Sequence, residues 1–307
     1  MIRGEDGQFI MMDWNEFRSA GSLIPIDIDN DGDVDLMSHR FVNFGNEERQ
    51  IVWDTHINNL IETGNFQFTL STSTIDTLKG QDNAAFIYSP IIADLNSDGF
   101  MDIFYAGPKY KDGFVDEKAP YVALMNQTNG TFIEDTANLF SNAEMLTHAR
   151  ELHVADFNGD QFNDLVVTSH GYDGGALAGE KNLLLLADSN LTFSADESKQ
   201  APFDYKGFTH SSAIGDLDND GDIDIVFSDI TGEDLTDEGN IHLLFNDGSG
   251  NFTKRTIANK QSNGGDMFIV STHLEDVDGD GSLDVILGGD ETRSPAVVLL
   301  NDGSGNF

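Results

Sequence analysis

The sequence has no cysteine, no long apolar run and few basic residues, with 16 lysines and arginines against 54 aspartates and glutamates. The lack of cysteine excludes disulfide bridges and zinc–thiolate sites. The formal net charge of −38 disfavours nucleic acid as a partner, because an anionic surface repels phosphate. No apolar run approaches the roughly 18 residues that cross a bilayer. Residues 1–17 mix charged with apolar residues, so we expect no signal peptide in this chain and no membrane insertion.

The composition is nevertheless that of a folded protein. Hydrophobic residues make up 39% of the chain, and it contains 22 phenylalanines, which is enough to build a core despite the charge. The length of 307 residues fits two average domains or one large all-β or α/β domain.

One nine-residue pattern, with Asp at positions one, five and nine, occurs five times. Its copies are Asp27–Asp35, Asp94–Asp102, Asp156–Asp164, Asp216–Asp224 and Asp276–Asp284. Their first residues are 67, 62, 60 and 60 positions apart. A Gly-x-Phe turn recurs at the same period and ends at Phe66, Phe132, Phe252 and Phe307, with a degenerate copy at Phe193. Self-similarity at such a period indicates a repeat architecture.

Short apolar runs flank each of these aspartate loops and predict strands. Examples are Phe268–Leu274 before a loop, Ile225–Phe227 after one, Ile241–Phe245 before a Gly-x-Phe turn and Thr253–Ile257 after it. Four short strands per unit predict an all-β fold, a β-propeller of four-stranded blades. We expect one β-propeller domain over residues 1–307, with repeat units at about 10–66, 67–132, 133–193, 194–252 and 253–307. Five units could close as a five-bladed ring or form a slice of a larger, for example seven-bladed, propeller.

The aspartate loops carry the residue types of a site for a hard cation. Positions one, three, five and nine hold only Asp or Asn, whereas position seven varies and suits a backbone carbonyl ligand. The predicted ligands are Asp27, Asp29, Asp31, Asp33 and Asp35 in loop one, Asp94, Asn96, Asp98, Phe100 and Asp102 in loop two, Asp156, Asn158, Asp160, Phe162 and Asp164 in loop three, Asp216, Asp218, Asp220, Asp222 and Asp224 in loop four, and Asp276, Asp278, Asp280, Ser282 and Asp284 in loop five.

Calcium is the ion that this ligand set predicts. It accepts six to eight oxygen ligands at loose geometry, whereas magnesium demands a stricter octahedron and keeps water. Two carboxylates ~4 Å apart repel by roughly 4 kcal/mol at an effective dielectric constant near 20, so three or four together need a counter-ion. We therefore expect up to five Ca²⁺ sites. An EF-hand is excluded, because Glu is absent at position twelve of all five loops.

Two positions distinguish loop three from the others. Position six is Gly in four loops, which permits a tight turn, but Gln161 in loop three. Position eight is apolar in four loops but Asn163 in loop three. We expect the third site to be the weakest candidate, and loops two and three to bind more weakly because their third position is Asn.

The loops together with the Asn-Asp-Gly-Ser-Gly-Asn-Phe turns at Asn246–Phe252 and Asn301–Phe307 resemble FG-GAP/VCBS repeats of integrin-α-type β-propellers. The resemblance covers essentially the whole chain. It implies that each loop joins the two inner strands of a blade and binds calcium. It also implies a calcium-binding, non-catalytic module for adhesion or ligand binding, located outside the cell or at its surface.

No nucleotide-binding loop, nucleophile elbow or zinc-protease motif occurs in the sequence, so we expect no enzymatic activity. Four histidines precede loops three to five, where they either line a central channel or simply pack: His148, His153, His210 and His273.

The connections between the second and third strands are long and variable, and we expect them to form one face opposite the calcium loops. They are predicted at His39–Gln50, Gly107–Pro120, His170–Lys181, Asp229–Gly239 and Gly288–Pro295. Such loops on a rigid scaffold commonly bind ligands, here a protein or a glycan. The alternative to an adhesion module is therefore a carbohydrate-binding lectin or the propeller of a polysaccharide-degrading enzyme. We expect a monomer or a part of a larger multidomain chain.

Overall fold

The structure is a computed structural model, and it describes residues 2–3, 9–10, 22–42, 50–64, 68–71, 90–107, 109–111, 114–118, 121–127, 131–172, 179–230, 240–258, 268–289 and 296–307. These residues fall into two compact units. The first contains residues 1–82 and 126–133, and the second contains residues 83–125 and 134–307. Each unit is described by itself.

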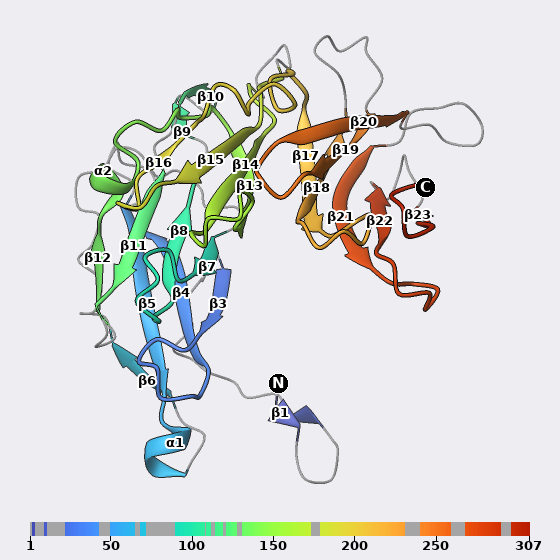
Figure 1. The fold of residues 1–307 in the computed structure, drawn as a ribbon. Helices are drawn as coiled ribbons and strands as arrows, with labels where there is room; N and C mark the ends of the chain where they lie inside the picture. The colour runs from blue at the N-terminus through green and yellow to red at the C-terminus, as the bar shows by residue number, and fades with distance from the viewer. Residues whose placement is uncertain are drawn as a thin grey trace. The chain divides into compact units, whose positions relative to one another are not determined.

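The first unit is built on one antiparallel sheet with the strand order β3-β4-β5-β6 (Figure 1). Its strands are β3 (Ser22–Ile26), β4 (Asp35–Val42), β5 (Gln50–Asn58) and β6 (Phe68–Ser71). A short helix α1 (Leu60–Thr63) lies between β5 and β6, and β1 (Ile2–Arg3) pairs with β2 (Phe9–Ile10). Residues 39–42, which the sequence analysis placed in a loop, belong to β4 and pair with β5, so that prediction was wrong. Phe41 and Val42 are residue types with a high propensity for strands, which favours this extension.

A second sheet has the order β7-β8-β11-β12. Its strands are β7 (Ile91–Ala93), β8 (Asp102–Tyr105), β11 (Val122–Asn126) and β12 (Phe132–Glu134). The connection from β8 to β11, expected as an open loop, contains the hairpin of β9 (Lys109–Lys111) and β10 (Phe114–Glu117). The helix α2 (Thr136–Leu139) follows β12.

Three further sheets lie in the second unit, and Figure 1 shows them in sequence order from green to red. The third sheet contains β13 (Ala149–Ala155), β14 (Asp164–Ser169), β15 (Leu183–Ala187) and β16 (Phe193–Ser194). The fourth contains β17 (Thr209–Gly215), β18 (Asp224–Asp229), β19 (Asn240–Asn246) and β20 (Phe252–Ala258). The fifth contains β21 (Ile269–Glu275), β22 (Asp284–Gly289) and β23 (Val297–Leu299). All are antiparallel meanders.

The sheets of the second unit pack face to face, which explains why their second strands are continuously apolar. All six residues of β14 and of β18 are buried. On β18, Ile225 and Phe227 pack into a cluster with Phe157 and Phe203 from the side of the third sheet. Val226, between them, packs on the other side with residues of the fifth sheet. Alternating side chains thus enter two different cores, as expected of a strand covered on both faces.

These sheets confirm the all-β prediction and the β-propeller of four-stranded blades. Four of the sheets have four strands, and three strands of the fifth lie in the described residues. The predicted strands at 241–245, 253–257 and 268–274 coincide with β19, β20 and β21 within a residue or two, and residues 225–227 lie in β18. Closure of a ring and the single-domain organisation of residues 1–307 remain predictions.

Candidate metal centres in the aspartate loops

Each aspartate loop joins the first and second strands of a sheet; Asp216–Asp224, for example, runs from β17 into β18. Position six has a left-handed backbone in every loop, with φ between 90° and 95° where it is Gly and 74° at Gln161. A Cβ atom added to any of these four glycines meets nothing within 4 Å. The turn therefore constrains the backbone and leaves room for a side chain, so Gln161 fits at a conformational cost of about 1 kcal/mol.

The first carboxylate organises each turn. In loop four, Asp216 accepts hydrogen bonds from the backbone N–H of Asp220 at 3.1 Å and of Gly221 at 3.0 Å. The fifth-position carboxylate then accepts the N–H two residues on, as Asp220 does from Asp222 at 2.9 Å. The other four loops repeat these bonds with distances between 2.8 and 3.1 Å. Because the turn fixes them, the side chains of positions one, three and five converge.

The ninth-position carboxylate is completely buried and holds three strands together. Asp224 accepts the N–H of Leu217 at 2.8 Å through Oδ2 and the N–H of Asn246, at the end of β19, at 2.7 Å through Oδ1. Asp35, Asp164 and Asp284 make the same pair of bonds. Burial raises the pKa of Asp224 to about 7, even though the two N–H donors oppose the shift. The pKa of Asp164 is raised to about 7 and that of Asp35 to about 6, with burial again the largest cause.

Three of the five loops bring carboxylates together closely enough to share one ion. The groups are Asp27, Asp29 and Asp31; Asp216, Asp218 and Asp224; and Asp276, Asp278 and Asp284. Each residue of a group offers a carboxylate oxygen within 4.8 Å of the others. Oxygens of Asp29, Asp31 and Asp218 are buried and accept no hydrogen bond. Burial, followed by repulsion from the neighbouring aspartates, raises the pKa of Asp29 and of Asp218.

These observations fit a divalent cation. A buried carboxylate oxygen without a donor costs free energy, and so does the mutual repulsion of the three charges. A cation at the convergence of the oxygens removes both costs. The oxygen-only donor set is the one that calcium prefers.

Loops two and three differ because their third position is an amide. Asn96 donates from Nδ2 to Asp98 at 3.0 Å, and Asn158 donates likewise to Asp160 at 3.1 Å. The amide thereby stabilises the fifth-position carboxylate by a hydrogen bond and adds no negative charge of its own. Neither loop forms a group of three acidic side chains among the described residues.

The side chains at position seven have unrelated environments, as expected if only the backbone is used there. Asp33 is buried and accepts the N–H of Ile61 in α1 at 3.1 Å. Phe162 packs against the core between the second and third sheets. Ser282 lies 3.5 Å from the amide of Asn219, and Asp222 is partly exposed.

An asparagine at the end of a third strand binds the aspartate loop of the preceding repeat, a feature that the sequence analysis missed. Asn246 donates from Nδ2 to the carbonyl of Phe157 at 2.9 Å, and Asn301 donates to the carbonyl of Leu217 at 2.7 Å. Within the first unit, Asn126 donates to the carbonyl of Ile28 at 2.9 Å. Asn246 and Asn301 are visible in the sequence as the first residue of each Asn-Asp-Gly-Ser turn. The carbonyl groups that accept their hydrogen bonds lie more than 80 residues away, so the sequence does not indicate them.

A family profile described as an FG-GAP-like repeat matches residues 94–167, 156–227 and 216–287, together more than half of the chain. The chain belongs to the FG-GAP-like repeat family. Each match begins at the first Asp of one loop and ends in the strand that follows the next loop, so each matched segment contains two of the aspartate loops described above. No curated protein gives a significant match to the sequence.

A solved structure with a similar fold is that of an Agrocybe aegerita lectin that recognises non-reducing terminal N-acetylglucosamine. The two share 18% sequence identity and superpose with a TM-score of 0.51. The match covers 93% of this FG-GAP-like chain and 64% of the lectin chain, so this chain spans less than two thirds of the lectin's length. At this identity the likeness concerns the fold alone.

The four histidines before the loops of this FG-GAP-like protein divide into two pairs. His153 and His273 line a cavity of about 440 Å³ on β13, β17 and β21, where His153 Nε2 lies 2.8 Å from Ser212 Oγ. His148 and His210 instead pack around His170, with ring centroids 3.7 and 5.9 Å from it. Burial lowers the pKa of His148 to about 3, of His170 to about 2 and of His210 to about 4. These three imidazoles are therefore neutral at pH 7.

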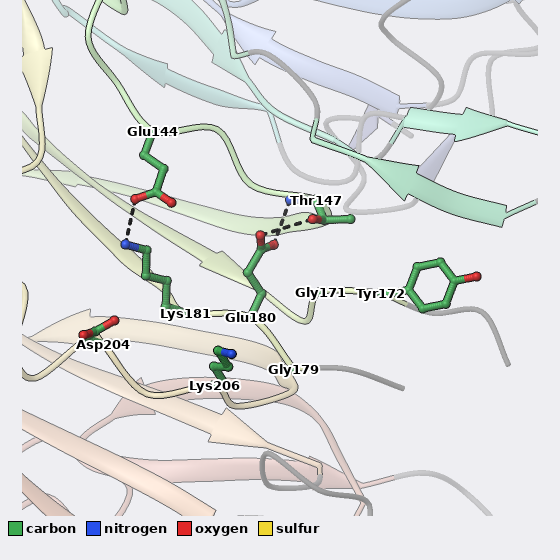
Figure 2. A pocket seen from close by; sticks show the side chains of 9 residues that line it. All are labelled: Glu144, Thr147, Gly171, Tyr172, Gly179, Glu180, Lys181, Asp204 and Lys206. Carbon is green, nitrogen blue, oxygen red and sulfur yellow. Dashed lines mark hydrogen bonds and ion pairs between the residues drawn. The ribbon is translucent and has the colours of Figure 1, made fainter. Parts of the chain in front are cut away.

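A pocket lies beside the connection between β14 and β15. Its volume is about 460 Å³, and it is lined by Glu144, Thr147, Gly171, Tyr172, Gly179, Glu180, Lys181, Asp204 and Lys206 (Figure 2). Tyr172, an aromatic residue of the predicted long connection His170–Lys181, thus lies at a pocket. The side chains of Tyr110 and Phe114, in the connection Gly107–Pro120, lie outside the described part. Among the described residues, no helix is both long and apolar enough to cross a membrane.

Proposed function

We propose that this chain is a calcium-stabilised, non-catalytic β-propeller module that binds a ligand outside the cell. The single observation that carries the proposal is the convergence of carboxylates in loops one, four and five, together with buried oxygens in loops one and four that accept no hydrogen bond. Membership of the FG-GAP-like repeat family supports it, and so does the ligand-binding role of the lectin with a similar fold.

Calcium would be held by the side chains at positions one, three, five and nine and by the carbonyl at position seven. In loop four these are Asp216, Asp218, Asp220 and Asp224, with the carbonyl of Asp222. Bound calcium supplies positive charge that offsets the repulsion among these carboxylates and stabilises the turn at the edge of its blade. Loops two and three would bind more weakly, because Asn96 and Asn158 supply no charge.

Extracellular adhesion to a protein is the first candidate role, in keeping with the abundance of calcium outside cells. A carbohydrate ligand is the second candidate. The observation in its favour is the pocket with Tyr172 at its edge and charged groups along its wall. Neither candidate requires a catalytic residue.

Thermal unfolding of the full chain tests the proposal. We expect calcium to raise the melting temperature and a chelator to lower it, because a ligand that binds only the folded state stabilises that state. Magnesium at equal concentration should give a smaller shift. The variant Asp278→Asn should reduce the calcium shift, whereas Glu197→Gln, an exposed carboxylate outside the loops, should leave it unchanged. Equal melting temperatures in calcium and in chelator would refute the proposal.

A further inference from the structure

The pocket beside Tyr172 is formed by three segments, each of which precedes a strand of the third or the fourth sheet. Glu144 and Thr147 precede β13, Gly179–Lys181 precede β15, and Asp204 and Lys206 precede β17. Its volume of about 460 Å³ falls within the range of small-molecule sites. The aspartate loops contribute nothing to its wall.

One side of the wall is fixed in place. The Glu180 carboxylate accepts hydrogen bonds from Thr147 N at 2.7 Å, Thr147 Oγ1 at 3.1 Å and Ser169 Oγ at 2.8 Å. The backbone of Gly179 approaches so closely that a Cβ atom there would lie 2.7 Å from the carbonyl oxygens of Lys206 and Gly207. This wall is therefore formed before any ligand arrives, which lowers the entropy cost of binding.

The charges around the pocket are of both signs in nearly equal number, unlike those of the chain as a whole. Glu144 pairs with Lys118 at 3.1 Å and with Lys181 at 2.7 Å. The lining therefore holds three carboxylates, of Glu144, Glu180 and Asp204, and two ammonium groups, of Lys181 and Lys206, while Lys118 lies outside it. The whole chain, in contrast, carries a formal charge of −38. Locally the wall offers donors and acceptors together, with one carboxylate more than ammonium groups.

The two ends of the pocket differ in chemistry. Glu144, Lys181 and Asp204 gather at one end, and the Tyr172 ring stands at the other (Figure 2). Among the described residues, no side-chain hydrogen bond engages Asp204, so its carboxylate is available as an acceptor. A tyrosine ring supplies an apolar face with a polar hydroxyl at its tip.

We propose that this pocket binds a neutral saccharide, an inference that rests on the ligand-binding role proposed above. Each sugar hydroxyl both donates and accepts hydrogen bonds, which matches a wall of mixed carboxylates and ammonium groups. The apolar face of a sugar ring can pack on Tyr172. Acidic glycans are disfavoured, because the net charge of the chain repels them and the pocket has no cationic excess to offset it.

The test uses the full chain in saturating calcium on an array of neutral and of sialylated or uronate-containing glycans. We expect binding to neutral glycans. The variants Tyr172→Ala and Asp204→Asn should each weaken that binding about tenfold, the loss expected when one hydrogen bond to a charged group or one stacking contact is removed. Glu197→Gln makes the same carboxylate-to-amide change as Asp204→Asn, seven residues earlier and outside the pocket, and should bind as the unmodified chain does.

Melting temperatures of all four proteins, measured with and without calcium, complete the test. Absence of neutral-glycan binding, binding of acidic glycans alone, or unchanged binding by both folded pocket variants would overturn the saccharide proposal. If calcium stabilises the chain but no glycan binds, the pocket proposal fails while the calcium-stabilised module stands. If glycans bind through Tyr172 and Asp204 without any calcium effect, the pocket proposal is supported and the calcium part of the proposed function fails.

Discussion

Asn163 donates a hydrogen bond from its side-chain amide to the carbonyl oxygen of Asp94, at 3.0 Å. This bond joins aspartate loop three to aspartate loop two, 69 residues earlier. The third strand of this sheet ends in Ala187, where the fourth and fifth sheets have Asn246 and Asn301. Asn246 and Asn301 each donate a hydrogen bond to the aspartate loop of the preceding repeat, which Ala187 cannot do. Asn163 makes such a bond from a different position. This hydrogen bond gives a structural reason for the departure from the apolar pattern at position eight.

Substitution of Asn163 by Ala should lower the free energy of unfolding by about 1 kcal/mol, because one partly buried amide–carbonyl hydrogen bond is lost. Urea denaturation in chelator measures the effect without calcium. The double variant Asn163→Ala, Ala187→Asn places an asparagine where the other sheets have one and should recover part of the loss. A double variant no more stable than Asn163→Ala alone would contradict the equivalence of the two positions.

Substitutions of Asp218 and Asp224, the third- and ninth-position aspartates of loop four, should differ in their effect on the free energy of unfolding. Without calcium, Asp224→Ala leaves the N–H groups of Leu217 and Asn246 without acceptors and should cost about 3 kcal/mol in total. Asp218→Asn removes a charge from the acidic cluster and should be nearly neutral or slightly stabilising. In the presence of calcium, the Asp218→Asn variant should have a lower free energy of unfolding than the unmodified chain. Equal effects of both variants in chelator would contradict the distinct role of the ninth position.

Acid should destabilise the protein through its buried histidines. The folded pKa values of His148, His170 and His210, about 3, 2 and 4, lie below the unfolded value of about 6.5. At low pH the unfolded chain therefore binds protons that the folded chain does not bind. The contribution of these histidines to the free energy of unfolding is complete above pH 6.5 and is lost progressively as the pH drops below it. Each group contributes about 1.4 kcal/mol per pH unit in that window. His210→Phe should show a weaker loss between pH 7 and pH 5.5 than the unmodified chain, by urea unfolding in chelator.

Buried carboxylates such as Asp164 and Asp224, whose folded pKa values are raised, change the stability with pH in the opposite direction. Both His210→Phe and the unmodified chain contain them, so comparing the two proteins at each pH cancels this contribution. An identical pH dependence in His210→Phe and the unmodified chain would show that His210 titrates normally in the folded protein.

The calcium affinity of an aspartate loop should be higher when position three is Asp than when it is Asn. Asn96→Asp replaces the amide that donates to Asp98 with a third acidic side chain in loop two. The variant should be less stable in chelator, because the carboxylates repel one another, and should show a larger calcium-induced rise in melting temperature. Asn251→Asp, at an asparagine outside the aspartate loops, is the matched control and should not enlarge the calcium shift. No increase in the shift for Asn96→Asp would argue against position three as a ligand.

The repeat unit and its strands could be predicted from the sequence because they depend on local signals. Apolar runs such as Ile225–Phe227 and the Asp and Gly spacing of the loops suffice to place strands, turns and candidate ligands. The double hydrogen bond of Asp224 could not be predicted, since it requires the register of β18 against β19. The Asn246–Phe157 bond requires the packing of one sheet on the next, across 89 residues. The anchoring of Glu180 by Thr147 likewise depends on segments that are brought together only by the fold.

Native mass spectrometry of the chain, titrated with calcium, tests the central claim most directly because it counts bound ions. We predict binding of calcium up to five ions, with three bound at lower calcium concentration than the others, and loss of one of these three in Asp278→Asn. A spectrum with no specifically bound calcium at any concentration that leaves the protein folded would contradict the account.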